Sequence, residues 1–112
     1  MAPTGADVLI VGGGLAGLTL ANYLGRQGRE PLIVEQAAEW RDGGYGIGLW
    51  ADGIDVLEEL DRLDAVRERA ADPETFEVRS GDRGVLTRTA LPDDETLLLA
   101  VHRGDLHAAL RE

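Results

Sequence analysis

The sequence predicts an α/β domain, with a parallel sheet, flanking helices and a β-hairpin excursion. Two short apolar runs, at residues 7–11 and 32–35, flank a helical pattern at residues 15–26. A strand, a helix and a second strand in such close succession favour parallel strands that are joined by a right-handed crossover. Two later runs, at residues 76–80 and 85–89, lie on either side of a glycine-bearing turn and predict the hairpin.

The strand-helix-strand unit is the clearest local pattern. Residues 7–11 are mostly β-branched or aliphatic, which is typical of a strand that is buried on both faces of a parallel sheet. Leucines at mixed spacings of three and four residues predict the helix at 15–26, and Gly28 is placed to end it in a left-handed conformation. Residues 32–35 predict a second buried strand, and this strand ends in an acid.

The remaining elements follow from simpler patterns. Residues 36–50 are rich in glycine and predict a loop. Asp52 is expected to cap a helix whose apolar stripe falls on Ile54, Leu57, Leu60 and Leu63. Residues 97–101 predict another strand, and residues 104–110 predict a helix that reaches Leu110-Arg-Glu112 without a stop signal.

Length, charge and composition narrow the classes of function. A chain of 112 residues corresponds to one domain, and its lack of cysteine excludes disulfides, thiolate nucleophiles and cysteine-based metal sites. A net charge of −10 disfavours nucleic acids and anionic membranes as partners. No apolar run or leader pattern indicates a membrane span or secretion, so we expect the cytoplasm. His102 and His107 do not share a metal-binding pattern, and we predict no metal site.

A glycine motif follows the first strand. Gly12, Gly14 and Gly17 form a Gly-x-Gly-x-x-Gly pattern that opens the helix, where Leu15 and Ala16 lie in the first turn. The first glycine permits a tight turn, the second lets the backbone approach a pyrophosphate, and the third lets helix and strand pack closely. The free N–H groups of the helix N-terminus attract the phosphate charge. This context predicts a Rossmann-like dinucleotide site.

The acid at the end of the second strand completes this motif. Glu35 lies 21 residues after Gly14, where a carboxylate accepts hydrogen bonds from the ribose hydroxyls of the adenosine. The same carboxylate would repel a 2′-phosphate, which disfavours NADP at this site. The motif by itself leaves both FAD and NAD open.

Several segments together resemble one family. Residues 8–21 and 32–35 are similar to the start of the group A flavin monooxygenases, the aromatic-hydroxylase type. Residues 41–49 resemble the glycine-rich segment of that family, and residues 54–63 resemble the helix that follows it. Residues 101–110 resemble a segment in which an arginine is followed by leucines three and seven residues later.

The resemblance implies a cofactor and its contacts. It implies that FAD binds at the glycine motif, that the segment with Arg41, Gly46 and Ile47 passes close to the flavin, and that Arg103 contacts the FAD. In the complete family, NAD(P)H reduces the flavin and O₂ supplies the oxygen that hydroxylates a small, often aromatic, substrate. No residue of this chain stands out as a catalytic acid, base or nucleophile, so its catalytic residues are unknown. The alternative for Arg103 is a surface ion pair with Asp105.

The resemblance covers the N-terminal part of the family, so residues 1–112 are expected to be a truncated portion of an FAD-binding domain. The later Asp-Gly and Gly-Asp motifs and the substrate-binding sheet are not in this sequence. Three hypotheses follow. The first is a fragment of an FAD-dependent monooxygenase, the second is an NAD-dependent reductase, and the third is a noncatalytic binding module that a second chain completes. Two interpretations remain open for the aromatic residues Trp40, Tyr45 and Trp50. They either shield a bound flavin or form part of a small hydrophobic core.

Overall fold

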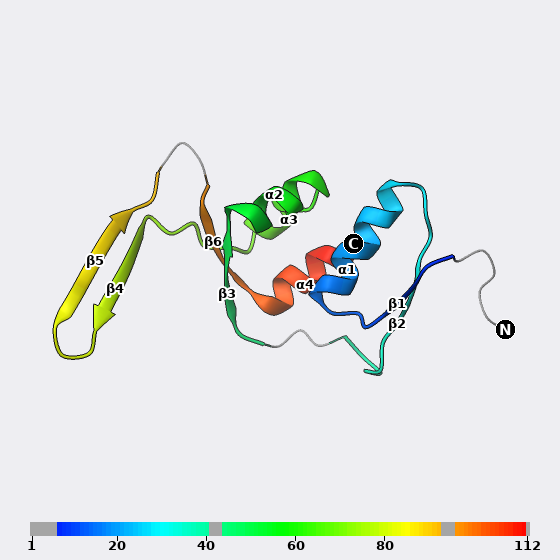
Figure 1. The fold of residues 1–112 in the computed structure, drawn as a ribbon, viewed down its shortest axis with the longest axis horizontal. Helices are drawn as coiled ribbons and strands as arrows, with labels where there is room; N and C mark the ends of the chain where they lie inside the picture. The colour runs from blue at the N-terminus through cyan, green and yellow to red at the C-terminus, as the bar shows by residue number, and fades with distance from the viewer. Residues whose placement is uncertain (1–6, 41–43, 93–95, 112) are drawn as a thin grey trace.

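A computed structural model describes residues 7–40, 44–92 and 96–111. The elements within these ranges form three two-stranded sheets, and the helices lie between the first and the second of them in chain order (Figure 1). In chain order they are β1 (Leu9–Val11), α1 (Leu15–Arg26), β2 (Leu32–Val34), β3 (Gly46–Trp50), α2 (Ala51–Glu59), α3 (Leu63–Arg67), β4 (Thr75–Ser80), β5 (Gly84–Ala90), β6 (Leu98–His102) and α4 (Arg103–Arg111). The predicted α/β class is confirmed.

The strand-helix-strand unit is present as predicted. β1 and β2 are parallel, and Ile10 lies opposite Ile33 in their register. Helix α1 ends where the sequence indicates, because Gly28 has a φ of +80° and its N–H donates to the carbonyl of Gly25 at 3.0 Å. A left-handed residue at this position stops the helix and turns the chain toward β2.

The prediction that the first strand is buried on both faces is wrong for the described residues. Ile10 is buried, whereas Leu9 is 59% exposed and Val11 is 80% exposed. The physical reason is that a strand directs successive side chains to opposite faces, and the described residues provide a helical layer on only one of them. The other face of the β1–β2 sheet is apolar and open.

The predicted loop at residues 36–50 is also wrong at its end, because residues 46–50 form β3. This strand pairs with β6 in an antiparallel register that runs from Gly46 opposite His102 to Trp50 opposite Leu98. Glycines at alternate positions give such a strand little propensity of its own. The pairing partner, which lies far along the chain, supplies the ladder that the local sequence does not indicate.

The predicted helix after residue 50 is divided into two. Trp50 occupies the N-cap of α2 and Asp52 lies in its first turn, so Asp52 does not cap the helix. The chain then turns at Asp61, which has a φ of +58°, before Leu63 starts α3. This left-handed residue breaks the helix, yet the apolar stripe still faces the core through Ile54, Leu57 and Leu60, and Leu63 packs against it.

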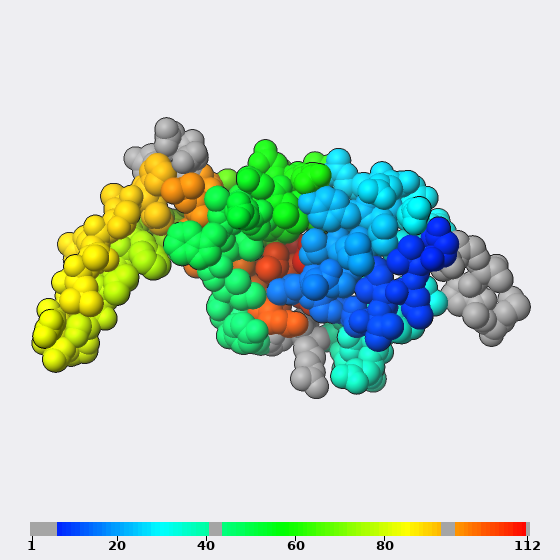
Figure 2. All heavy atoms as spheres, viewed as in Figure 1, coloured from blue at the N-terminus to red at the C-terminus, as the bar shows by residue number. Residues whose placement is uncertain are grey.

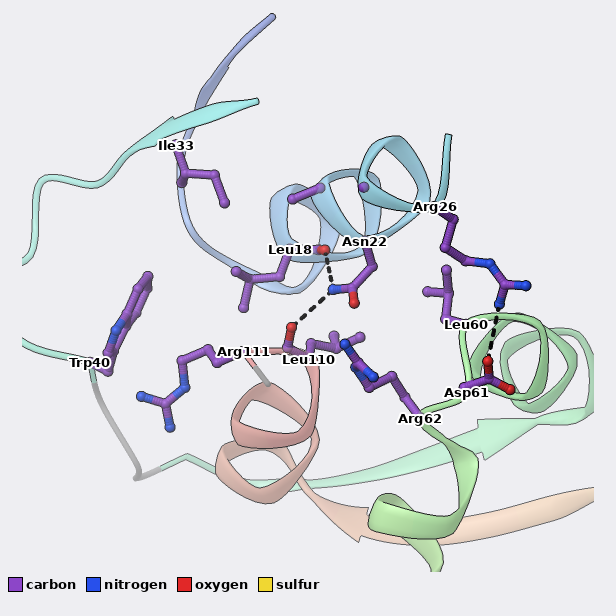
Figure 3. A pocket seen from close by; sticks show the side chains of 12 residues that line it. Leu18, Asn22, Arg26, Ile33, Trp40, Leu60, Asp61, Arg62, Leu110 and Arg111 are labelled. Carbon is purple, nitrogen blue, oxygen red and sulfur yellow. Dashed lines mark hydrogen bonds and ion pairs between the residues drawn. The ribbon is translucent and has the colours of Figure 1, made fainter. Parts of the chain in front are cut away.

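The core lies where α1 and α4 pack together, beneath α2 and α3. Its buried members are Leu18, Leu57, Val66, Val101, Leu106, Ala109 and Leu110. The side-chain amide of Asn22 joins the two helices, because its Nδ2 donates to the carbonyl of Leu110 at 2.9 Å and to that of Leu18 at 2.8 Å (Figure 3). Within the described ranges, no helix combines the length and apolar character that a membrane span requires.

The predicted hairpin is confirmed and extends from the rest of the fold as an arm (Figures 1 and 2). Gly84 follows the turn with a φ of +75°, and a bulge lies at Val78 and Arg79. Every residue of β5 is exposed. The arm contacts the body through Phe76, whose ring meets that of Trp50 edge-on at a centroid distance of 5.6 Å.

Candidate functional site

The glycine loop leaves β1 in a conformation that favours glycine. Gly12 has a φ of +109°, which side chains other than hydrogen rarely tolerate. Its N–H donates to the carbonyl of Val34 at 2.7 Å, which ties the loop to the end of β2. The turn is therefore held against the second strand before the helix begins.

The other two glycines of the motif are required for different reasons. A Cβ at Gly17 would lie 2.2 Å from the carbonyl oxygen of Gly12 and 3.2 Å from Ile10, so only glycine lets α1 approach β1 this closely. A Cβ at Gly14 would meet nothing within 4 Å. Gly14 thus faces open space, which is what the close approach of a ligand to the backbone requires.

Helix α1 directs unpaired donors toward this loop. Its first intrahelical hydrogen bond joins the N–H of Leu18 to the carbonyl of Gly14 at 3.0 Å. The N–H groups of Leu15, Ala16 and Gly17 therefore have no acceptor inside the helix. Together with the positive end of the helix dipole, these donors form a site that suits an anion such as a pyrophosphate.

Glu35 lies beside the loop and is bonded to it. Its Oε1 accepts the N–H of Gly13 at 2.9 Å, and its Oε2 accepts the N–H of Ala37 at 2.7 Å. Each carboxylate oxygen can accept more than one hydrogen bond, and the side chain is exposed at the end of β2. The carboxylate is thus held in place by the backbone while it stays accessible to the hydroxyls of a ligand.

A cleft of about 460 Å³ brings these groups together with the start of α4. Its lining includes Gly13, Gly14, Glu35, Trp40, Arg103 and His107. Arg103 is half-buried, and its backbone N–H donates to the carbonyl of Tyr45 at 2.8 Å. Asp105 forms its ion pair with Arg69 at 3.3 Å. The alternative of a surface pair between Arg103 and Asp105 is therefore not what the structure contains.

Not all of the predicted residues lie at the cleft. Gly46 and Ile47 belong to β3, and Ile47 packs against the core. The side chains of Leu15 and Ala16 line an apolar groove together with Ile47, so only their backbones face the loop side. Arg41 lies outside the described residues. The structure gathers Gly14, Glu35 and Arg103 at one cleft and leaves Gly46 and Ile47 apart from it.

Two further residues lie at the cleft: His107, for which the sequence predicted no role in binding, and Trp40, for which a flavin shield was one of two interpretations. His107 is 4% exposed, and its Nε2 lies 2.7 Å from the carbonyl oxygen of Gly13. Trp40 packs beside it at a ring centroid distance of 5.2 Å, and Arg111 lies 5.5 Å over the Trp40 ring (Figure 3). The sequence contained a signal for His107. Residues 103 and 107 are four apart at the start of a predicted helix, and His107 therefore shares one face with the arginine that was selected.

The other aromatic residues near the loop do not line this cleft. Tyr45 is largely exposed, and Trp50 lies against the hairpin arm. The interpretation of Trp40, Tyr45 and Trp50 as a small core is wrong, because all three are exposed. Of these residues only Trp40 contributes to the wall of the cleft.

Comparisons with known proteins agree with this geometry. A family model described as FAD binding domain matches residues 5–109. The 3-(3-hydroxy-phenyl)propionate/3-hydroxycinnamic acid hydroxylase of Mycobacterium sp. (strain JLS) is 37% identical over 90 residues, which are 80% of this chain and 16% of that protein. The 3-amino-4-hydroxybenzoate 2-monooxygenase of Streptomyces platensis is 33% identical over 111 residues, which are 94% of this chain and 28% of that protein.

Solved structures give the same result for the fold. The structure of a 2-methyl-3-hydroxypyridine-5-carboxylic acid oxygenase superposes with a TM-score of 0.82 at 31% identity, and covers 97% of this chain and 29% of that one. The chain thus spans less than a third of the length of these relatives. The match of the family model over nearly the whole sequence, together with the glycine loop and Glu35, leads to one conclusion. The chain belongs to the FAD binding domain family, whose cofactor is FAD.

Proposed function

We propose that this chain binds the ADP part of FAD in the cleft between the glycine loop, Glu35 and Arg103. The observation that supports this most directly is the convergence of three kinds of group on one cleft. These are the free N–H groups at the start of α1, the carboxylate of Glu35, and the guanidinium-bearing side chain of Arg103. Each suits a different part of an adenosine diphosphate.

The roles follow from charge and hydrogen-bonding capacity. The N–H groups of Leu15, Ala16 and Gly17 donate to the pyrophosphate, and the open space at Gly14 admits it to the backbone. Glu35 accepts hydrogen bonds from the ribose hydroxyls, and Arg103 adds positive charge near the phosphates. The contacts of Arg41, Gly46 and Ile47 with the flavin side remain predictions from the family resemblance.

We further propose that the chain acts as the N-terminal part of a flavin-dependent monooxygenase. A bound flavin supplies the transfer of reducing equivalents from NAD(P)H and the activation of O₂. The residues of this chain bind and orient the cofactor. Two relatives are named for the hydroxylation or monooxygenation of aromatic acids, and this supports a small aromatic substrate. The substrate site then requires a further segment or a second chain. We also propose that the protein is located in the cytoplasm.

A titration of the 112-residue chain with FAD, NAD and NADP tests the cofactor. We expect FAD to bind with the lowest Kd, measured by flavin fluorescence and by the rise in Tm. The variant Gly25→Ala changes a glycine of α1 that faces open space and does not line this cleft, so its Kd for FAD should equal that of the unaltered chain. A preference for NAD would contradict the proposal and favour the NAD-dependent reductase.

A further inference from the structure

The backbone of Gly13 is held on both sides of its Cα, with one contact to each of the two peptide groups that it joins. Its N–H donates to Glu35 at 2.9 Å, and its carbonyl oxygen lies 2.7 Å from Nε2 of His107. The two side chains come from the end of β2 and from α4, which lie far apart in sequence. The middle residue of the glycine loop is therefore fixed by long-range contacts as well as by its own backbone.

The chemistry of the two atoms defines the hydrogen bond. A carbonyl oxygen can only accept, so Nε2 of His107 carries the proton and donates it. Nδ1 of the same ring is buried, and within the described residues it has no hydrogen-bond partner. A proton there would need an acceptor, so the contacts of the ring fit the tautomer with hydrogen on Nε2.

This bond has a consequence for the atoms that face a ligand. In a trans peptide the C=O and the following N–H point in opposite directions, so fixing the carbonyl of Gly13 also fixes the N–H of Gly14. The carbonyl that His107 engages is also the one that Gly17 would use if the helix began one residue earlier. The N–H of Gly17 thus stays outside the helical ladder and is available to an anion.

We propose that His107 is a positioning residue for FAD. By holding the carbonyl of Gly13 toward α4, it orients the N–H groups of the loop, and Trp40 keeps its ring in place. His107 therefore acts on the cofactor through the backbone of the loop. This inference rests on the proposed binding of FAD at this cleft.

Two substitutions separate the hydrogen bond from the packing of the ring. His107→Phe keeps an aromatic ring against Trp40 and removes the donor, whereas His107→Gln places an amide N–H near the position of Nε2. We expect the Kd for FAD to rise about three- to tenfold in His107→Phe, as the loss of one hydrogen bond implies, and to stay within about twofold in His107→Gln. Equal affinity in His107→Phe and the unaltered chain would overturn the inference.

A control from the same helix excludes a general loss of packing. Leu110 is buried in α4 and does not line the cleft. Leu110→Ala is expected to lower the Tm while the Kd for FAD, measured well below that Tm, stays within about twofold. If Leu110→Ala weakens FAD binding as much as His107→Phe does, then helix packing explains the effect and His107 has no positioning role.

A measurement without cofactor keeps this inference separate from the proposed function. In the unaltered chain, ¹⁵N NMR of the His107 ring should show a protonated Nε2 and an unprotonated Nδ1. The amide signal of Gly14 should shift in His107→Phe and return toward its original position in His107→Gln. An unaltered chain that binds no FAD would overturn the proposed function. A ring protonated at Nδ1, or an unmoved Gly14 signal, would overturn the role of His107 with or without FAD.

Discussion

The glycine loop and the turn at the tip of the hairpin arm both contain glycine, yet different contacts hold them. The loop at residues 12–17 is fixed by Val34, Glu35 and His107, which lie on other elements. The turn at residues 81–84 is held by its own ladder and by a hydrogen bond from Ser80 to Asp82. A turn that only reverses the chain needs local contacts, whereas a turn that presents donors to a ligand is fixed by the surrounding structure.

The largest effect is expected from Gly17→Ala. The new Cβ would lie 2.2 Å from the carbonyl oxygen of Gly12, and backbone atoms cannot move away as a flexible side chain would. We expect the free energy of unfolding, measured with urea, to fall by about 3 kcal/mol or more. Gly25→Ala is the control, because alanine there meets nothing within 4 Å and should stabilise the helix by about 0.5–1 kcal/mol. Equal stability of the two variants would contradict the steric argument.

Gly14→Val is expected to remove ligand binding and leave the fold intact. The side chain would enter the open space beside the loop, where the pyrophosphate is proposed to lie. We expect the Kd for FAD to rise about hundredfold or more, which corresponds to about 2.7 kcal/mol, while the unfolding midpoint changes little. Gly81→Val in the hairpin turn also points into open space and should leave the Kd unchanged. Loss of binding in both variants would argue against a specific site at Gly14.

Glu35→Gln should have a smaller effect on the same site. The amide group puts a donor where Gly13 and Ala37 already donate, so the side chain can no longer accept from both N–H groups. A hydrogen bond to a charged group contributes about 1.5–3 kcal/mol, so we expect FAD binding to weaken about tenfold to hundredfold. Isothermal titration calorimetry measures this directly. Unchanged affinity would mean that neither the hydrogen bonds of Glu35 to the loop nor a contact of Glu35 with the cofactor contributes to FAD binding.

The smallest effect is expected from a charge change on the arm. Glu77 binds both Arg79 and Arg88 on the exposed surface of the hairpin. Such pairs contribute little, so Glu77→Ala should change the free energy of unfolding by less than about 1 kcal/mol. The Kd for FAD should stay within about twofold. A larger change in FAD affinity would show that the arm is coupled to the cleft, and the contrast between the two regions would fail.

Much of the fold was predictable because its signals are local. The glycine motif between two apolar runs predicted the β1–α1–β2 unit, and Gly28 marked the end of α1 correctly. The runs on either side of residues 81–84 predicted the hairpin. In each case the residues that carry the signal also form the structure, through steric limits on the backbone and short-range hydrogen bonds.

Other features were missed because their partners lie far along the chain. Strand β3 has glycines at alternate positions, and its ladder depends on β6. The break between α2 and α3 occurs at Asp61, where α1 provides a counter-ion through Arg26 at 3.7 Å (Figure 3). The apolar stripe of this segment was predicted correctly, but it does not reveal where the helix is interrupted. Side-chain periodicity reports which face is buried and says little about breaks in the backbone.

The sequence by itself determined the identity of the loop, its glycines and the acid at the end of β2, since steric and electrostatic requirements there act on neighbouring residues. The family resemblance implies the contact of Arg103 with FAD, and only the tertiary structure decided that His107 approaches this loop from the same helix, α4. It also decided that Trp40 lines the cleft and that Ile47 does not. The reason is physical: the position of α4 depends on its packing against α1 and on the hydrogen bonds of Asn22. The spacing of residues 103 and 107 places them on one helix face, but it does not encode what that packing places beside this face.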